Sequence, residues 1–474
     1  MPYTSFSSHA IAELSEDFTL PDYFPEIRRV ISSSNSVSVD GKYSSDAFLE
    51  VDGSVTYSVL YLTADNFLAQ TSHTSPFTAK IKLPPSSPLH PQAFLTTSSV
   101  DSSACRVLSQ RKLNLSSKVS LSATAAEPKN VTLDCTTDLA PRLLKKSHTS
   151  ASVCELRAEG ECSGELREHD LDSIIAASAN VCTSDVRLSD NKVRFSGEAY
   201  LTLLLKDKNN HIYTSRTRTP VTHELPIPDN IDGKAACAAF PTVTMTEVTA
   251  EDDILHWSME YAVDLDLAAE HEDEVAVDAF LPDRDSEELT ITSIPTMNIH
   301  GIASGRLTFG GRIKTEQDSK HVFSFGSGEV DSVSSSCGKV TVAGHVKLCS
   351  VVEKDGEYTT AEETFPVKYE CDSQFSCDGE GKRPLKSMIQ VCDVNAREDG
   401  DGLNLTAELS VSVFSAVEGE IKSVSGIVPT GGERKNCDNV IRVYIPDDDE
   451  DDWSIEKKFR LKNEVTREGG IYII

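Results

Sequence analysis

Three stretches of the sequence share one pattern: "AFLEVDGSVTYSVLYLTADN" (47–66), "NKVRFSGEAYLTLLLKDKNN" (191–210) and "GKVTVAGHVKLCSVVEKDGE" (338–357). Each stretch has a short apolar run, a central glycine (Gly53, Gly197 or Gly344), a longer run and then a polar turn. Within them apolar and polar residues alternate, as strands that bury one face do. The pattern therefore predicts strands at all three places.

The sequence around these stretches repeats as well. Each is followed by a second strand-like segment (74–84, 219–228 and 363–371) and then by a further strand pair (111–125, 255–270 and 403–419). Repetition at this scale indicates a repeated structural unit. We expect a mainly β protein made of three repeated sandwich-like or barrel-like units with short helices, followed by a small C-terminal α/β module.

Two segments show helical spacing of apolar residues. In residues 20–34, Tyr23, Ile27, Val30 and Ile31 have this spacing and Asp22 is placed to cap a helix, and residues 168–180 occupy the equivalent place in the second unit. Residues 319–330 occupy that place in the third unit, where glycines disfavour a helix. We therefore expect helices in the first two units.

Segments that contain Gly, Pro or clustered charges mark the expected boundaries. They divide the chain into units at 1–145, 146–295 and 296–435 and a terminal element at 438–474. The length suggests about three domains, because domains have about 150 residues each.

The chain is acidic, with 45 Lys and Arg against 75 Asp and Glu and a formal net charge of −30. Such a surface repels phosphate, which argues against nucleic acid and anionic membranes as partners. The first residues lack a basic segment followed by an apolar run, and apolar stretches such as 199–205 are far shorter than the ~20 residues that span a bilayer. We expect no signal peptide, no transmembrane segment and a cytoplasmic location.

The twelve cysteines show neither a CxxC pair nor the ligand spacing of a zinc site. For a chain that stays in a reducing compartment, this usage favours free buried thiols over disulfides.

The sequence contains no catalytic motif: nucleophile elbow, phosphate-binding loop and zinc-protease signatures are all missing. We predict no catalytic, cofactor-binding or metal-binding residues and no enzymatic activity. Residues 392–404 contain clustered acids but lack the glycine and final glutamate of a calcium loop, so a polar hairpin is favoured. The acids of 268–288 are interpreted as a solvated strand edge, with a glycosidase-like carboxylate pair as the alternative.

One basic cluster stands out from the acidic background. It comprises Arg106, Arg111 and Lys112, just before a predicted strand. It is either a charged strand entry or a docking patch for an acidic surface, and both interpretations stay open.

Three segments in order resemble the SPOCS family, the spore-coat-associated domain of endospore-forming bacteria. They are "LPDYFPEIRRVIS" (20–32), "VDGSVTYSVLYL" (51–62) and "RVLSQRKLNLSSKVSL" (106–121). The resemblance is strongest in 15–125, weaker in the second unit and weakest in the third. It implies that the first two units are SPOCS-like β-domains and that the third is a divergent β-domain.

The end of the chain resembles a degenerate LysM domain, a module that often closes proteins of this family. Tyr444 and Trp453 are nine residues apart, as in that motif, and "WSIEKKF" (453–459) matches its helix. Asp449 and Asp452 replace the Gly and Leu of the motif. We expect Trp453, Ile455 and Phe459 to form the buried face of a short helix, with Ile471 and Ile473 closing the core.

The resemblance implies a non-enzymatic adaptor of endospore envelope assembly. Such a protein would lie in the mother cell at the forespore surface and dock coat or basement-layer morphogenetic proteins. The docking candidates are Trp453, Ile455, Lys457, Lys458, Phe459, Arg106, Arg111 and Lys112. The alternatives are a LysM protein that binds peptidoglycan or another glycan, and an extracellular β-sandwich adhesin. The sequence gives no oligomeric state.

Overall fold

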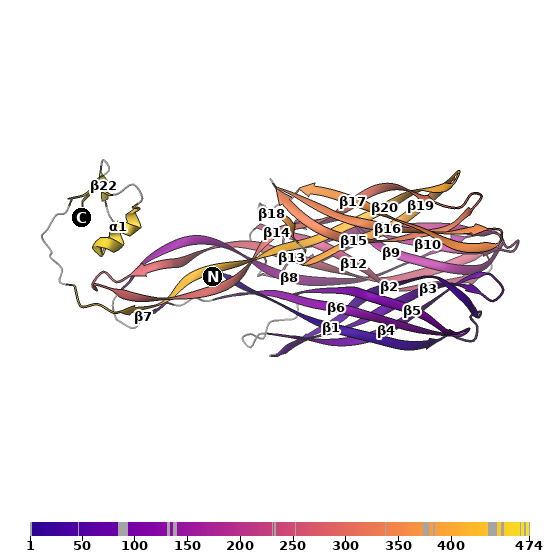
Figure 1. The fold of residues 1–474 in the computed structure, drawn as a ribbon, viewed down its shortest axis with the longest axis horizontal. Helices are drawn as coiled ribbons and strands as arrows, with labels where there is room; N and C mark the ends of the chain where they lie inside the picture. Colours follow the sequence, from indigo (N-terminus) through magenta and orange to yellow (C-terminus); the bar gives the residue numbers. More distant parts are fainter. Residues whose placement is uncertain are drawn as a thin grey trace.

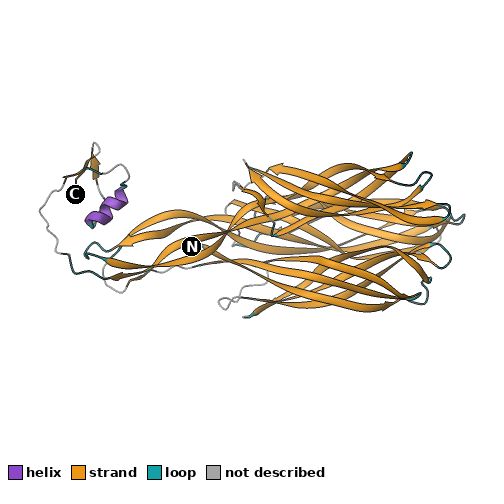
Figure 2. Ribbon diagram, viewed as in Figure 1, coloured by secondary structure: helices purple, strands orange, loops and turns teal. Residues whose placement is uncertain are grey.

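The computed structural model of the 474-residue chain shows an elongated β protein (Figures 1 and 2). It describes residues 2–45, 47–83, 93–129, 133–135, 140–229, 231, 234–251, 253–336, 338–372, 379–382, 384–434, 443–446, 450–464, 466–468 and 471–473.

The first unit is a sandwich of two three-stranded antiparallel sheets, with the orders β1-β6-β5 and β2-β3-β4. Its strands are β1 (Tyr3–Thr19), β2 (Ile27–Ser44), β3 (Phe48–Thr63), β4 (Leu68–Lys82), β5 (Phe94–Ser109) and β6 (Lys112–Pro128). The alternating residues of β3 and β6 point into a shared core, which includes Val51, Val55 and Leu115.

The second unit repeats this sandwich, with the sheet orders β12-β13-β8 and β11-β10-β9. Its strands are β8 (Arg142–Arg167), β9 (Leu171–Ser189), β10 (Lys192–Asp207), β11 (Ile212–Pro226), β12 (Lys234–Glu251) and β13 (Ile254–Phe280). Trp257, one of the two tryptophans, is buried in its core.

The third unit has the sheet orders β14-β20-β19 and β17-β16-β15-β18. Its strands are β14 (Glu287–Lys314), β15 (Lys320–Ser336), β16 (Lys339–Lys354), β17 (Glu357–Asp372), β18 (Gly379–Lys382), β19 (Lys386–Asp399) and β20 (Gly402–Pro429). Residues 392–404 form the β19–β20 hairpin, as the sequence predicted.

The three units share one topology. In each, the last strand lies between the first and the next-to-last strand, and the second to fourth strands form the other sheet, to which the third unit adds β18. The predicted fold class, mainly β with a repeated unit, is therefore confirmed.

The central glycine of each repeated stretch faces an irregularity in the neighbouring strand. Gly53, Gly197 and Gly344 each lie beside a point where the pairing skips one residue of the preceding strand. The skipped residues are Asp40, Ser184 and Asp331. A Cβ at Gly197 would lie 2.7 Å from the carbonyl oxygen of Cys182. A β-bulge brings the two backbones too close for a side chain, which explains why glycine recurs here.

Both helices predicted from spacing are wrong. Ile27 begins strand β2, and residues 171–189 form strand β9. The pairing skips Arg28 and Ile31 in β2, and Asp172 and Ile175 in β9. Each skipped residue shifts the alternation of faces by one position, so that bulged strands imitate helical spacing.

Four long strands extend beyond the sandwiches and form an arm, visible between the body and the C-terminal module in Figure 1. They are β8, β13, β14 and β20, of 26, 27, 28 and 28 residues. A small apolar core holds the arm together, including Leu281, Val424 and Ile427. The short strand β7 (Asp134–Cys135) pairs in parallel with β20. The boundary expected at 295 falls inside β14, where Pro295 is accommodated because β14 is an edge strand.

The three units pack against one another. One apolar cluster combines Leu95 of the first unit, Phe240 of the second and Ile299 of the third. A second cluster combines Leu60, Leu204 and Phe323, again one from each unit. The sandwiches therefore share interfaces and form one body.

Candidate functional site

The C-terminal module lies at the far end of the arm (Figure 1). It contains the only helix among the described residues, α1 (Asp452–Phe459), and the sheet β21-β23-β22. The strands are β21 (Val443–Tyr444), β22 (Thr466–Glu468) and β23 (Ile471–Ile473). Asp451, from the acidic run before Trp453, caps the helix by accepting a hydrogen bond from the Ser454 amide at 2.8 Å.

The core of this module differs from the prediction. Ile455 and Tyr472 are buried, whereas Trp453 is only half-buried. The side chains of Ile471 and Ile473, expected to close the core, lie outside the described residues. The prediction was thus correct for Ile455, but Trp453 lies between the helix and the arm.

Asp278, near the end of β13 in the arm, receives two side chains of the helix. Its carboxylate accepts a hydrogen bond from Nε1 of Trp453 at 2.8 Å and is bridged by Nζ of Lys457 at 2.7 and 2.8 Å. The Trp453 ring also packs on Phe280, 5.2 Å between centroids. Partial burial opposes ionisation of Asp278, but the hydrogen bonds from Lys457 and Trp453 outweigh it and lower its pKa.

Two ion pairs with buried acids also join the module to the arm, beside a more exposed pair between Lys462 and Asp283. Arg460 pairs with Glu287 at the start of β14, and Arg142 at the start of β8 pairs with Glu456 of the helix. Both acids are buried. Buried charges need such partners, so these ion pairs fix the position of the module on the arm.

The other predicted docking residues of the tail also have partners within the chain. Lys458 bonds to Glu450 at 2.7 Å and lies over the Tyr444 ring. Phe459 packs edge-on against Tyr444. The helix thus holds the module together on one side and binds the arm on the other.

The basic cluster of the first unit is engaged locally. Arg111 donates to the carbonyl oxygens of Pro21 and Phe24, and Lys112 pairs with Asp17 at 2.9 Å. Arg106 is exposed on β5. Arg111 and Lys112 therefore stabilise the strand entry, and the structure does not bring the cluster together with the tail candidates.

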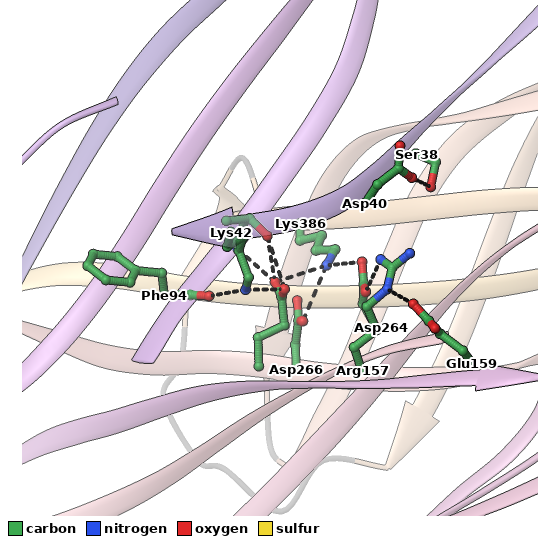
Figure 3. Close-up of polar contacts among 11 residues, drawn as sticks. Ser38, Asp40, Lys42, Phe94, Arg157, Glu159, Asp264, Asp266 and Lys386 are labelled. Carbon is green, nitrogen blue, oxygen red and sulfur yellow. Dashed lines mark hydrogen bonds and ion pairs between the residues drawn. The ribbon is translucent and has the colours of Figure 1, made fainter. Parts of the chain in front are cut away.

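A second charged site, which sequence reasoning missed, lies where the three units meet (Figure 3). Lys42 of β2 bonds Glu155 of β8 at 2.5 Å, and the amide of Thr96 in β5 donates to the same carboxylate at 2.8 Å. Lys386 of β19 lies 3.2 Å from Asp266 of β13. Each unit thus contributes charge to one buried network.

Burial alone would raise the pKa of both Glu155 and Asp266, but the net shift differs because the two groups have different partners. Lys386 and Lys42 outweigh the burial of Glu155 and lower its pKa to about 2. For Asp266 burial dominates and raises the pKa to about 8. Environments that shift the pKa values of two neighbouring carboxyl groups in opposite directions are unusual outside functional sites and structural ion networks.

An open cleft of about 1240 Å³ adjoins this network. Its lining comes from all three units and is rich in hydroxyl side chains, such as Ser38, Ser98 and Ser387. Lys386 and Asp264 lie in its wall, so the network has a route to solvent.

One disulfide corrects the expectation that all thiols are free. Cys182 of β9 and Cys392 of β19 are bonded across 210 residues and tie the second unit to the third. The free cysteines among the described side chains are Cys105, Cys154, Cys162, Cys237, Cys349 and Cys371. Spacing could not reveal the pair, because the partners meet only after two units have packed.

No group of three or more His, Cys, Asp or Glu side chains is placed to hold a metal within the part of the chain that the structure describes. The same part has no helix with the length and apolar character needed to cross a membrane.

Comparison of the chain with protein-family models, curated proteins and solved structures gives no match.

Proposed function

We propose that this chain is a non-enzymatic structural adaptor that presents its C-terminal module at a distance from a rigid β body. The observation that supports this proposal is the attachment of the module to the arm. Trp453 and Lys457 converge on Asp278, and Arg460 reaches Glu287. A module fixed in this way keeps a set position relative to the body, as an adaptor that spaces two partners requires.

The SPOCS and LysM resemblances suggest where such an adaptor would act. The adaptor would lie in the mother cell, around the forespore, where it would connect the basement layer of the spore coat to later coat proteins. The β body would bind one side and the module the other.

Two experiments test this proposal. A fluorescent fusion of the full chain should form a ring around the forespore during sporulation, and uniform fluorescence in vegetative cells would contradict the proposal. Co-purification with the basement-layer ATPase should be lost when residues 438–474 are deleted, while the full chain with Lys80→Met, a change far from the module, should retain it.

The glycan-binding alternative receives less support from the geometry. Sugar-binding sites use aromatic faces and polar groups that are free to contact the ligand. The Trp453 ring packs on Phe280 and its Nε1 is already bonded to Asp278. Retention of the full chain on purified peptidoglycan would nevertheless establish this function.

The disulfide favours a second candidate, an extracellular adhesin. Bonds such as Cys182–Cys392 persist mainly in oxidising compartments. Alkylation of thiols in freshly lysed cells, before any reductant is added, separates the two settings. Unmodified Cys182 and Cys392 support the adhesin, and full alkylation of both supports the mother-cell adaptor.

A further inference from the structure

The ammonium of Lys386 faces three carboxylates of the second unit. Nζ lies 3.2 Å from Oδ1 of Asp266, 3.5 Å from Oδ2 of Asp264 and 3.6 Å from Oε2 of Glu155. Figure 3 shows the side chains of Lys386, Asp264 and Asp266 converging. Lys386 comes from β19 of the third unit, so the contact crosses a boundary between units.

The Lys386–Asp266 pair is enclosed. The side chain of Asp266 is 0% exposed, that of Glu155 4% and that of Lys386 12%. The Phe240 ring covers the ammonium at 4.7 Å. Thr96 donates its amide and hydroxyl to Glu155 and fixes its position. An amine and a carboxyl group are thus held together with little water.

The environment of Asp266 favours its protonated form. Burial raises its pKa well above the usual range of an aspartic acid, although the Lys386 ammonium beside it acts in the opposite direction. Its second oxygen, Oδ2, is buried without a hydrogen-bond partner within the described structure. A neutral carboxyl group can be attacked by an amine, whereas a carboxylate resists attack. An unsatisfied buried oxygen also costs free energy, about 1–3 kcal/mol.

Two of the three cations at the junction have other carboxylate partners. Lys42 pairs with Glu155 at 2.5 Å, and Arg157 pairs with Asp264 at 3.1 Å and with the exposed Glu159 at 3.2 Å. Lys386 lies nearest to Asp266, at 3.2 Å, so loss of its charge would leave the other pairs intact.

We propose that Lys386 and Asp266 condense to an intramolecular isopeptide bond that joins the third unit to the second. Glu155 takes one proton from the Lys386 ammonium, and the Nζ lone pair then attacks Cγ of Asp266. The Cγ–Oδ2 bond breaks, and Oδ2 leaves as water with its own proton and a second proton from Nζ. The amide retains the last Nζ proton, and the proton on Glu155 passes to solvent.

Burial opposes the charge on Lys386, but the acidic side chains around it outweigh burial and raise its pKa, so its neutral amine is rare. Two features compensate for this. The groups are fixed in contact, and well-oriented intramolecular reactions reach effective molarities of about 10⁵–10⁸ M. The bond also forms only once in each chain, so a slow step suffices. Water can leave through the adjoining cleft, whose wall includes Lys386.

The decisive measurement is the mass of the full chain after purification, denaturation and reduction of the disulfide. We expect a mass one water molecule below that of the sequence. A protease digest should contain one branched peptide that joins the segments around 266 and 386. A full sequence mass, or a loss of water with these two peptides separate, would overturn the proposal.

Variants assign the roles. Lys386→Met and Asp266→Ala should restore the full mass, and Glu155→Gln should lower the linked fraction at least tenfold in freshly made protein. Lys80→Met, which removes an exposed pair with Glu50, is the matched control and should remain one water lighter. If a junction variant does not fold, the mass and digest of the unaltered chain still decide the matter. A linked fraction unchanged in Glu155→Gln would overturn the proton-transfer role of Glu155.

Discussion

Nε1 of Trp453 donates a 2.8 Å hydrogen bond to Oδ2 of Asp278, across 175 residues of sequence. The same carboxylate holds Lys457, so one side chain of the arm anchors both an aromatic and a cationic residue of helix α1. The position of the C-terminal module therefore depends strongly on one residue of β13.

Asp278→Ala should release the C-terminal module from the arm. Hydrogen bonds to charged groups contribute roughly 1.5–3 kcal/mol each, and partial exposure reduces this, so we expect a loss of about 1–2 kcal/mol in the free energy of docking. In a Trp257→Phe background Trp453 is the only tryptophan, and its emission should shift to longer wavelength. Asp283→Ala removes the more exposed pair with Lys462 and should change emission little. An unshifted spectrum for Asp278→Ala would show that the other contacts suffice.

Docking of the module should weaken in acid. The pKa of Asp278 is lowered from 3.8 in the docked state, so ionised Asp278 stabilises docking. This contribution is complete above about pH 4 and is lost as the pH falls through the lowered pKa. A pH titration of Trp453 emission should show the transition, and Asp278→Asn should abolish it. Trp257, followed in a Trp453→Phe chain, reports whether the body unfolds in the same range. Coincident transitions of the two tryptophans would contradict separate release of the module.

The β architecture was predictable because its signal is local. Alternation in β3, β10 and β16 follows from burial of one face, and the repeated glycine marks the bulge beside each strand. Other bulges in β2 and β9 misled the prediction, since a skipped residue such as Ile31 changes the period of the pattern. In a single sequence, a bulged strand and a helix can show the same spacing of apolar residues. Only the strand pairing distinguishes them.

The candidate sites were less predictable because their partners are distant. Trp453 stood out by its rarity, yet nothing near it in the sequence indicates Asp278. Glu155 and Asp266 have the positions of solvent-facing residues in an alternating strand, but other units cover that face. Only the packing of three units turns a polar face into a buried network.

Gly53→Ala should destabilise the first unit. A Cβ there would meet the Phe77 ring at 2.6 Å and lie closer still to the Ser38 carbonyl oxygen, which the bulge holds in place. Overpacking of this kind costs about 1–3 kcal/mol. Differential scanning calorimetry should show a lower unfolding temperature. Gly310→Ala is the matched control, because the nearest atom to its Cβ is 4.0 Å away, and its unfolding temperature should be unchanged. Equal effects of the two changes would refute the role of the bulge.

Lys42→Met should strongly weaken the junction. Glu155 is buried, and the change removes the cation at 2.5 Å from it. Breaking a buried ion pair by removing one partner costs about 3–5 kcal/mol, whereas an exposed pair contributes about 0–1 kcal/mol. Urea unfolding followed by circular dichroism should show this loss for Lys42→Met and almost none for Lys80→Met, because Lys80 is exposed and its pair with Glu50 lies at the surface. A loss below about 1 kcal/mol for Lys42→Met would mean that Thr96 and Lys386 satisfy Glu155 without it.

Reduction of the Cys182–Cys392 bond should destabilise the second and third units. The bond closes a loop of 210 residues, and native disulfides typically contribute about 2–5 kcal/mol, largely by restricting the unfolded chain. Trp257 lies in the core of the second unit, so its emission in a Trp453→Phe chain reports unfolding there. Its urea midpoint should fall with reductant. A chain carrying both Cys182→Ala and Cys392→Ala should start at a lower midpoint and show no further response, because reductant then has no bond to break. Cys105→Ala, a free thiol of the first unit, should respond as the unaltered chain does. If the double variant still responded to reductant, another bond would have to account for the effect.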